Sequence, residues 1–206
     1  MDLQYLQYQL TCYGIKKSKL QSWKNQEFSN YGFYVEGCPV KQELLYVMSV
    51  EEMGRFEKAL AECAVLVLGS NKEHSYSCNS LVLEEGGREK VCNCLNEIFL
   101  AYEKWNFAVK NAESLSPDIL FDAATPILHT PMTIINNAYS YLARNDLYKK
   151  AIPEDFFSEE DLDNLVWDKE FYLCQDKTGI YDYQLITEGI NMLCYNILIE
   201  KKYYAR

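Results

Sequence analysis

The chain of 206 residues is 49% hydrophobic and 24% charged, a composition typical of a globular protein, which excludes intrinsic disorder. It contains no run of about 18 apolar residues and no basic segment ahead of an apolar core near its start. We therefore expect neither a membrane span nor a secretory signal.

The net charge of −10 is unevenly distributed along the chain. Residues 1–113 carry 12 basic and 15 acidic side chains and residues 114–206 carry 8 and 15, so the two parts have net charges of −3 and −7. The longest basic stripe is only Lys16–Lys19, whereas a protein that grips phosphates needs an extended basic surface. We expect no direct nucleic-acid binding by this chain. If the protein regulates DNA, its DNA-binding part lies elsewhere.

The eight cysteines are scattered singly, apart from Cys92 and Cys94, and no CxxC pair occurs. Several lie in apolar stretches, where a thiol behaves as a small buried hydrophobe. Without a secretory signal, this pattern favours a reduced cytoplasmic protein. His74 and His129 are far apart in the sequence and do not form a ligand cluster, so we expect no metal site and no cofactor.

The first predicted helix is capped by Asp2 and stops near Gly14. Its apolar face comprises Leu3, Leu6 and Leu10. Two strands are predicted next, at residues 31–36 and 43–48.

A strand–helix–strand unit follows. Ser49 and Glu52 have the spacing of a capping box, which opens a helix. The apolar residues of that helix at helical spacing are Met53, Phe56, Leu60 and Cys63. Residues 64–68 are an uninterrupted apolar run typical of a buried strand, and residues 79–84 are another strand. This order is a βαβ unit, so we expect residues 1–87 to form a small α/β domain with a partly parallel sheet.

Residues 88–113 are predicted to form one long helix that connects two domains. Apolar residues recur along it at alternating intervals of four and three, the spacing of a coiled-coil seam. The predicted seam consists of Val91, Leu95, Ile98, Tyr102, Trp105 and Val109. Two interpretations remain open. The helix either lies across its own domain's sheet or pairs with a second copy in a homodimer, and different faces could do both.

Residues 114–206 are predicted to form a second domain. Ser116 and Pro117 have the pattern of an N-cap and first helical position, and the helix is expected to bend near Pro126. A hairpin at residues 131–143 turns at Asn136 and Asn137. Residues 145–168 are predicted to be an acidic loop with a short helix that Ser158 caps. Strands are predicted at 171–174, 181–186 and 192–204, with turns at 177–179 and near Gly189. Because the chain stops within an apparent strand, we expect that this sheet is truncated or that the last strand is an edge.

The segment from Val91 to Ala143 resembles the sensory region of bacterial transcription regulators of the PucR/CdaR type. The resemblance rests on IFLAYEKW (residues 98–105), on LFDAATPILHTPM (residues 120–132) and on the Tyr-x-Tyr-Leu-Ala strand at 139–143. Upstream, CNSLVLEE at 78–85 ends a strand–helix–strand unit similar to the domain that precedes the sensor in such regulators. Where these sensors often carry Asp at the hairpin turn, this chain has Asn136 and Asn137.

The resemblance implies an α+β protein in which the second domain is a PAS- or GAF-like antiparallel-sheet sensor. It also implies a cytoplasmic regulator whose C-terminal helix-turn-helix is outside this chain. The motifs of serine hydrolases, zinc proteases, β-lactamases and kinases do not occur, so we expect no enzymatic activity.

Many of the 17 tyrosines fall on predicted strands of the second domain. Such aromatic side chains with a polar tip suit either a small planar or polar ligand or ordinary sheet packing. The residues predicted to bind a ligand are Asn136, Tyr139, Tyr141, Trp167, Tyr181, Tyr183 and Tyr195.

These observations predict the ligand-sensing and dimerisation portion of a transcription regulator, with an unknown small-molecule effector and a second copy of the chain as partners. The alternative is a non-catalytic interaction or dimerisation module without a small-molecule ligand.

Overall fold

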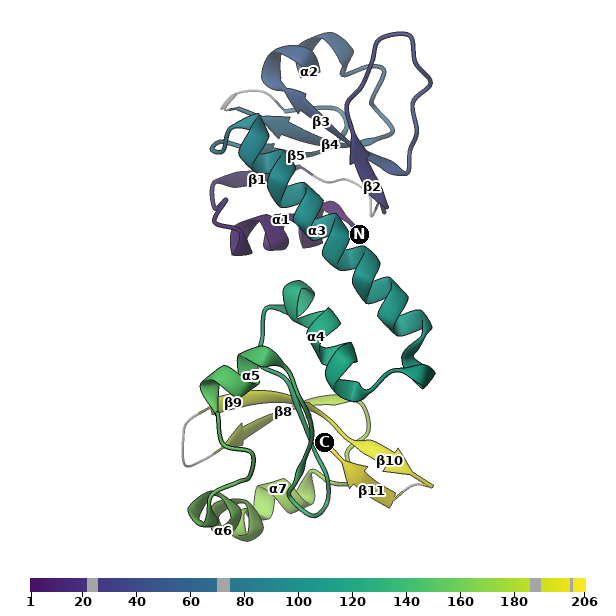
Figure 1. Cartoon of the computed structure of the whole chain (residues 1–206). Coiled ribbons are helices and arrows are strands. Elements are labelled where there is room, and N and C mark those ends of the chain that lie inside the picture. The colour runs from purple at the N-terminus through teal and green to yellow at the C-terminus, as the bar shows by residue number, and fades with distance from the viewer. Residues whose placement is uncertain (22–25, 70–74, 186–189, 201) are drawn as a thin grey trace. The chain divides into compact units, whose positions relative to one another are not determined.

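The computed structural model describes residues 1–206 except 22–25, 70–74, 186–189 and 201 (Figure 1). The chain forms two compact units, Met1–Asn106 and Phe107–Arg206. Both combine helices with strands, which confirms the predicted α+β class. The division falls within helix α3 (Arg88–Lys110), so most of the predicted connecting helix belongs to the first unit.

The first unit is built around a five-stranded sheet of order β1-β5-β4-β3-β2. The strands are β1 (Ser18–Gln21), β2 (Asn30–Gly32), β3 (Leu44–Ser49), β4 (Ala64–Leu68) and β5 (Asn79–Leu83). Strand β1 runs antiparallel to β5, and the other neighbours are parallel. Helix α2 (Val50–Phe56) connects β3 to β4 along the chain, and these two strands pair in parallel, which confirms the predicted βαβ unit.

Local sequence signals account for the helix starts in this unit. The Asp2 side chain accepts a hydrogen bond from the Tyr5 N–H and begins α1 (Leu3–Cys12). Ser49 and Glu52 form the predicted capping box at α2. Helix α2 is shorter than predicted and ends at Phe56. The chain then continues in turns to Cys63, which still buries Leu60.

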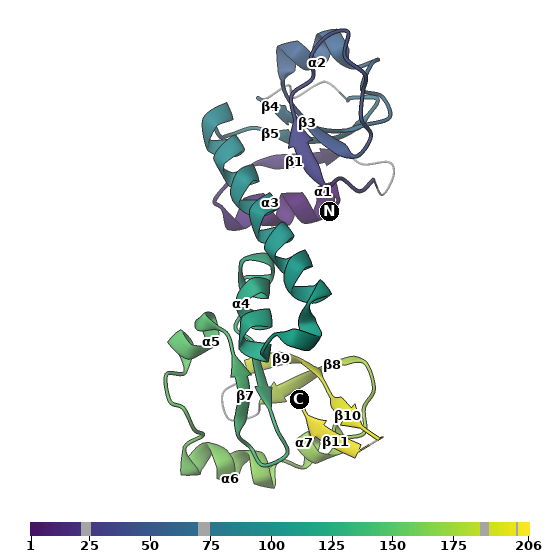
Figure 2. The same ribbon diagram turned by 45° about the vertical axis from the view of Figure 1, so that its right-hand side comes forward.

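Helices cover both faces of the five-stranded sheet. Helices α1 and α3 lie on one face and α2 lies on the other (Figures 1 and 2). The first face buries the apolar stripe of α1 and the first half of α3 against Leu45, Leu66 and Leu81. The second face buries Met53 and Leu60 against Val65 and Val67. Strands β3 to β5 are therefore buried on both sides, which explains their continuous apolar runs.

The residues of the predicted seam differ in burial along α3. Val91, Leu95 and Ile98 are buried in the core of the first unit, so this half of the heptad pattern packs on the chain's own sheet and is not free for a second copy. This corrects the homodimer interpretation for those three residues. Tyr102 and Trp105 are half-buried, and Val109 is exposed.

The second unit contains four short helices and three two-stranded antiparallel sheets among its described residues. The α-helices are α4 (Pro117–Leu128), α5 (Asp146–Ala151), α6 (Glu159–Trp167) and α7 (Lys169–Leu173), and a 3₁₀ turn η1 (Ala112–Ser114) precedes them. The strands are β6 (Thr133–Ile135), β7 (Tyr141–Arg144), β8 (Ile180–Leu185), β9 (Ile190–Tyr195), β10 (Ile197–Ile199) and β11 (Lys202–Ala205).

The pairing of these strands is β6 with β7, β8 with β9 and β10 with β11. The predicted hairpin of β6 and β7 is confirmed. Strand β11 also reaches this hairpin, because the backbones of Ile135 and Arg206 exchange two hydrogen bonds of 2.7 and 2.8 Å. The end of the described chain is thereby held beside a hairpin that lies far earlier in the sequence.

Besides α2, four further predictions were wrong in part. Residues 171–173 are helical in α7, because the Asp168 side chain caps that helix by accepting hydrogen bonds from the Glu170 and Phe171 N–H groups. Within the predicted acidic loop, Asn145 caps the additional helix α5. The predicted strand 192–204 is three strands, and β2 (Asn30–Gly32) overlaps the predicted strand 31–36 only at Tyr31 and Gly32. The turn predicted near Gly189 lies outside the described residues.

Candidate functional site

A partly buried polar and aromatic cluster in the second unit includes two of the predicted ligand residues, Tyr181 and Tyr183. The Arg206 cluster, as we call it, consists of Arg206, Asn196, Phe171, Tyr181, Tyr183 and Tyr203. Phe171 comes from α7, Tyr181 and Tyr183 from β8, Asn196 from the junction of β9 and β10, and Tyr203 from β11.

The alternation of strand β8 directs its tyrosines into the cluster. Tyr181 pairs with Cys194 and Tyr183 with Met192 across the β8–β9 ladder, and both tyrosines join the core of the second unit. Ile180 faces the other side of the ladder and is 70% exposed. A period of two in side-chain direction therefore separates a buried face from an exposed one.

The guanidinium of Arg206 is surrounded by aromatic rings. Its carbon Cζ lies 4.3 Å from the ring centre of Phe171, and 5.4, 5.8 and 5.7 Å from those of Tyr181, Tyr183 and Tyr203. These separations allow cation–π attraction, which is strongest where water is excluded. Nε donates to Asn196 Oδ1 at 3.0 Å, and Nη2 donates to the Phe171 carbonyl at 3.3 Å.

Asn196 links the cluster to the turn that follows α7. Its Nδ2 donates to the carbonyls of Cys174, Gln175 and Lys177 at 2.6, 3.2 and 3.0 Å. Its Oδ1 accepts from Tyr181 Oη at 2.6 Å in addition to Arg206. A buried amide with this many partners fixes both the turn and the arginine in place.

Burial perturbs the tyrosines of the cluster. Desolvation raises the pKa of Tyr181 from 10.0 to about 12, opposed by the positive charge of Arg206. The pKa of Tyr183 is raised further by burial and by its hydrogen bond to the carboxylate of Asp168. Burial raises the pKa of Tyr203 as well. All three phenols therefore act as neutral groups at physiological pH.

Of the predicted ligand residues, Tyr139 lies next to the cluster. Its ring centre is 5.8 Å from that of Phe171, and its hydroxyl donates to Tyr172 Oη at 3.2 Å. Its φ of 57° places a bulky residue in the left-handed region, which residues other than glycine rarely adopt. Asn136 forms the turn beneath it, where its Oδ1 accepts from the N–H groups of Ala138 and Ser140.

Tyr141 belongs to a different group. Its ring packs against Phe157 with 4.6 Å between centres, Arg144 stacks over it at 4.7 Å, and its hydroxyl accepts from Tyr148 at 3.3 Å. Arg144 also pairs with Asp155 at 2.5 Å.

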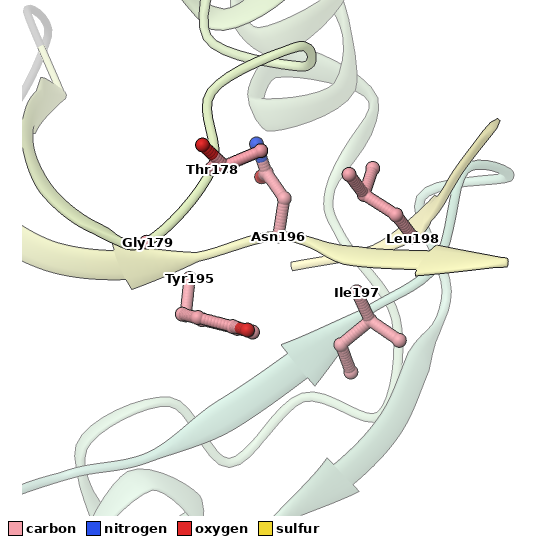
Figure 3. A pocket seen from close by; sticks show the side chains of 6 residues that line it. All are labelled: Thr178, Gly179, Tyr195, Asn196, Ile197 and Leu198. Atoms are coloured by element: carbon pink, nitrogen blue, oxygen red, sulfur yellow. The ribbon is translucent and has the colours of Figure 1, made fainter. Parts of the chain in front are cut away.

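Trp167 and Tyr195 lie outside the cluster core. Trp167 is 79% exposed at the end of α6 and does not line the cluster. Tyr195 is 59% exposed, but it lines a small surface pocket of about 240 Å³ beside the cluster (Figure 3). The other lining residues are Thr178, Gly179, Asn196, Ile197 and Leu198.

The close view of this pocket shows Asn196 directed toward Thr178, whereas Tyr195 and Ile197 extend on the opposite side of the strand (Figure 3). Asn196 is therefore shared by the pocket and the Arg206 cluster. A displacement of Asn196 in the pocket would therefore also disturb its hydrogen bonds in the Arg206 cluster, and the reverse.

The sequence interpretation missed Arg206, Asn196 and Asp168. Arg206 ends the sequence KYYAR, and its guanidinium lies over the ring of Phe171, which comes from α7. The pattern of a single strand does not reveal a contact with another element. Asn196 interrupts an apolar run between Tyr195 and Ile197, and a polar residue in such a run is a usable signal for a buried hydrogen-bonding role.

Metal and membrane chemistry find no support in the described part of the chain. No group of three or more His, Cys, Asp or Glu side chains there is arranged to hold an ion. None of the helices in the described ranges combines the length and apolar character needed to cross a bilayer. Comparison with known proteins gave no match to a family model, to a curated protein or to a solved structure.

Proposed function

We propose that this chain is the ligand-sensing and dimerisation portion of a bacterial cytoplasmic transcription regulator of the PucR/CdaR type, and that it has no catalytic role. The DNA-binding domain is a separate part of the parent protein. The second unit acts as the sensor, and the effector is a small polar molecule.

The observation that carries this proposal is the Arg206 cluster. A core that served only for packing would be built from apolar side chains, whereas this one encloses a cation, an amide and three phenols. Such groups provide directional hydrogen bonds in an apolar enclosure, which is the usual composition of a small-molecule site.

The effector would act by a difference in its affinity for two arrangements of the second unit. Asn196 ties Arg206 to the turn after α7 and also lines the surface pocket, so ligand contact at the cluster alters the support of that turn. In the parent protein this change would be passed on to the DNA-binding domain.

The test is a thermal-unfolding screen of the whole chain against small carboxylic acids, sugars, amines and nucleobases, combined with sedimentation equilibrium over a range of protein concentrations. The expected result is a saturable rise in melting temperature with one chemical group of compounds, and a dimer. A chain that no compound stabilises and that stays monomeric at every concentration would overturn the proposal.

A second candidate function, an interaction module without a small-molecule ligand, is favoured by the outer face of the β8–β9 ladder. Ile180 and Leu193 are 70% and 73% exposed, and Ile180 is paired across the ladder with the exposed Tyr195. Leu193→Asp would then abolish self-association, whereas the matched change Asn191→Asp on the same exposed strand would leave the weight-average mass unchanged. Ligand-induced stabilisation with equal association of both variants contradicts this candidate.

A further inference from the structure

Two buried polar atoms of the second unit lack a hydrogen-bond partner among the described residues. They are Nη1 of Arg206 and Oη of Tyr203, and the guanidinium carbon of Arg206 lies 5.7 Å from the centre of the Tyr203 ring. Buried polar groups in native proteins are almost always hydrogen-bonded, because the loss of water is otherwise uncompensated. Two orphaned groups in one cluster therefore point to a missing partner.

Arg206 also makes no salt bridge among the described residues. The ion pairs of the described residues join Arg88 to Glu52, Arg144 to Asp155 and Lys149 to Asp118, and none involves Arg206. The carboxylate of Asp168 contacts the cluster at Tyr183, and it already accepts hydrogen bonds from Tyr183 and from the start of α7. The cation is thus held by rings and two neutral acceptors only.

The same unit contains a matched arginine for comparison. Arg144 also stacks on a tyrosine, Tyr141, and its side chain is only 11% exposed. Its guanidinium is nevertheless satisfied by the carboxylate of Asp155 and by the carbonyls of Ile152 and Glu154. The two stacked arginines differ in that one has its anion and the other does not.

We propose that Arg206 Nη1 and Tyr203 Oη form the binding site for an oxyanion group, which a small ligand supplies as a carboxylate or a phosphate. The proposal rests on the sensory function proposed above and names the chemical class of the effector. One oxygen of the anion accepts from the guanidinium and the phenol together, a charge-assisted arrangement that is stronger than a neutral hydrogen bond. Since both atoms are covered, a surrounding ring must move aside when the ligand enters.

The experiment uses the whole chain with sodium acetate and inorganic phosphate as probes and sodium chloride at matched ionic strength as the reference. Thermal unfolding and the side-chain Nε–Hε NMR signal of Arg206 are both followed. Three variants are compared with the wild type: Arg206→Lys, which keeps the charge but loses the planar fork; Tyr203→Phe, which removes only Oη; and the control Tyr204→Phe, at the exposed neighbouring position.

The expected result is a saturable response to an oxyanion beyond that to chloride in the wild type and in Tyr204→Phe. The affinity should fall about tenfold in Tyr203→Phe and disappear in Arg206→Lys. A response to acetate assigns the site to a carboxylate, and a response to phosphate alone assigns it to a phosphorylated ligand. Equal responses to all three salts, or an unchanged affinity in Tyr203→Phe, would overturn the proposal.

Tyr203→Phe keeps the test independent of folding defects. Because its hydroxyl has no partner in this structure, its removal should leave the melting temperature in chloride unchanged or slightly raised. The result also separates this site from the broader function. Metabolite stabilisation that survives Arg206→Lys rejects the anion site but keeps the sensor. An anion site without any metabolite response or dimer keeps the site and rejects the sensor.

Discussion

Asn196 shows how one side chain organises the second unit. It is buried, it donates to carbonyls of the turn after α7, and it accepts from Tyr181 and Arg206. Removing it would leave several buried groups without partners at once. At the scale of single residues, the hydrogen bonds of Asn196 together contribute more to stability than any one of the aromatic contacts around it.

We therefore predict that Asn196→Ala lowers the free energy of unfolding by about 3 kcal/mol, because Tyr181 Oη, the Arg206 Nε–H and the carbonyls of Gln175 and Lys177 lose their hydrogen bonds to this side chain. Chemical denaturation measures the change. The matched control is Asn191→Ala on the exposed side of β9, which should stay within about 0.5 kcal/mol of the wild type. Equal effects of the two substitutions would contradict this role of Asn196.

The raised pKa of Tyr181 predicts that the free energy of unfolding falls at alkaline pH. Its pKa is raised from 10.0 to about 12 by burial, so the folded chain holds the phenolic proton more tightly than the unfolded chain does. The stabilising contribution is therefore complete below pH 10 and is lost as the pH rises toward about 12. Denaturation curves across this range should show a shallower decline for Tyr181→Phe than for the wild type. Parallel declines would show that Tyr181 does not titrate as described.

The residues of the candidate site were predictable only in part. The alternation in strand β8 correctly brings Tyr181 and Tyr183 to one face, because side-chain direction in a strand follows from sequence order. The convergence of Phe171, Asn196 and Arg206 on those rings depends on how α7 and β11 pack, and no local pattern encodes such long-range packing. Tyr141 and Trp167 were expected in the same site because they are aromatic residues on or near predicted strands of the second domain, and the structure separates them from it.

At the scale of elements, α3 combines a buried and an exposed stripe in the same helix. Leu95 is fully buried against the sheet of the first unit, whereas Leu100, five residues further along, is 52% exposed. The heptad spacing is thus satisfied by an intramolecular sheet, at least through Ile98. A period of three and four marks an apolar stripe but does not say which surface will cover it.

This contrast gives a prediction with an internal control. Leu95→Ala should destabilise the first unit by about 3 kcal/mol, because it removes buried methyl groups and leaves a cavity. Leu100→Ala should change the free energy of unfolding by less than about 1 kcal/mol. Urea denaturation followed by circular dichroism measures both. A large effect of Leu100→Ala that depends on protein concentration would instead place Leu100 in an interface between copies.

Elements with strong local signals were predicted well, whereas elements with weak or ambiguous signals were not. Strand β4 was predicted with its observed bounds because an apolar run closed by Gly69 leaves little alternative. Helix α7 was predicted as a strand, since a short apolar run fits either structure and the Asp168 cap is a single-residue signal. Helix α5 was overlooked although Asn145 caps it, because its six residues carry no apolar stripe long enough to show a period.

At the scale of the whole molecule, the net charge of −10 disfavours direct binding to nucleic acid. A protein that binds duplex DNA gains affinity by neutralising phosphates and releasing counterions, and an acidic chain is repelled instead. We predict that residues 1–206 cause no change in the fluorescence anisotropy of a labelled duplex even at low salt. A basic protein that binds duplex DNA serves as the positive control. Salt-sensitive binding by residues 1–206 alone would contradict this prediction.

The pairing of β1 with β5 has a consequence for the order in which the protein is made. Residues 18–21 cannot enter the sheet until residues 80–83 have left the ribosome, and the apolar stripe of α1 likewise waits for α3. At about 5–20 residues per second, several seconds of synthesis separate these segments. Throughout that interval the nascent chain lacks the β5 and α3 surfaces that complete the core around Leu3, Leu6 and Leu10 in the folded protein.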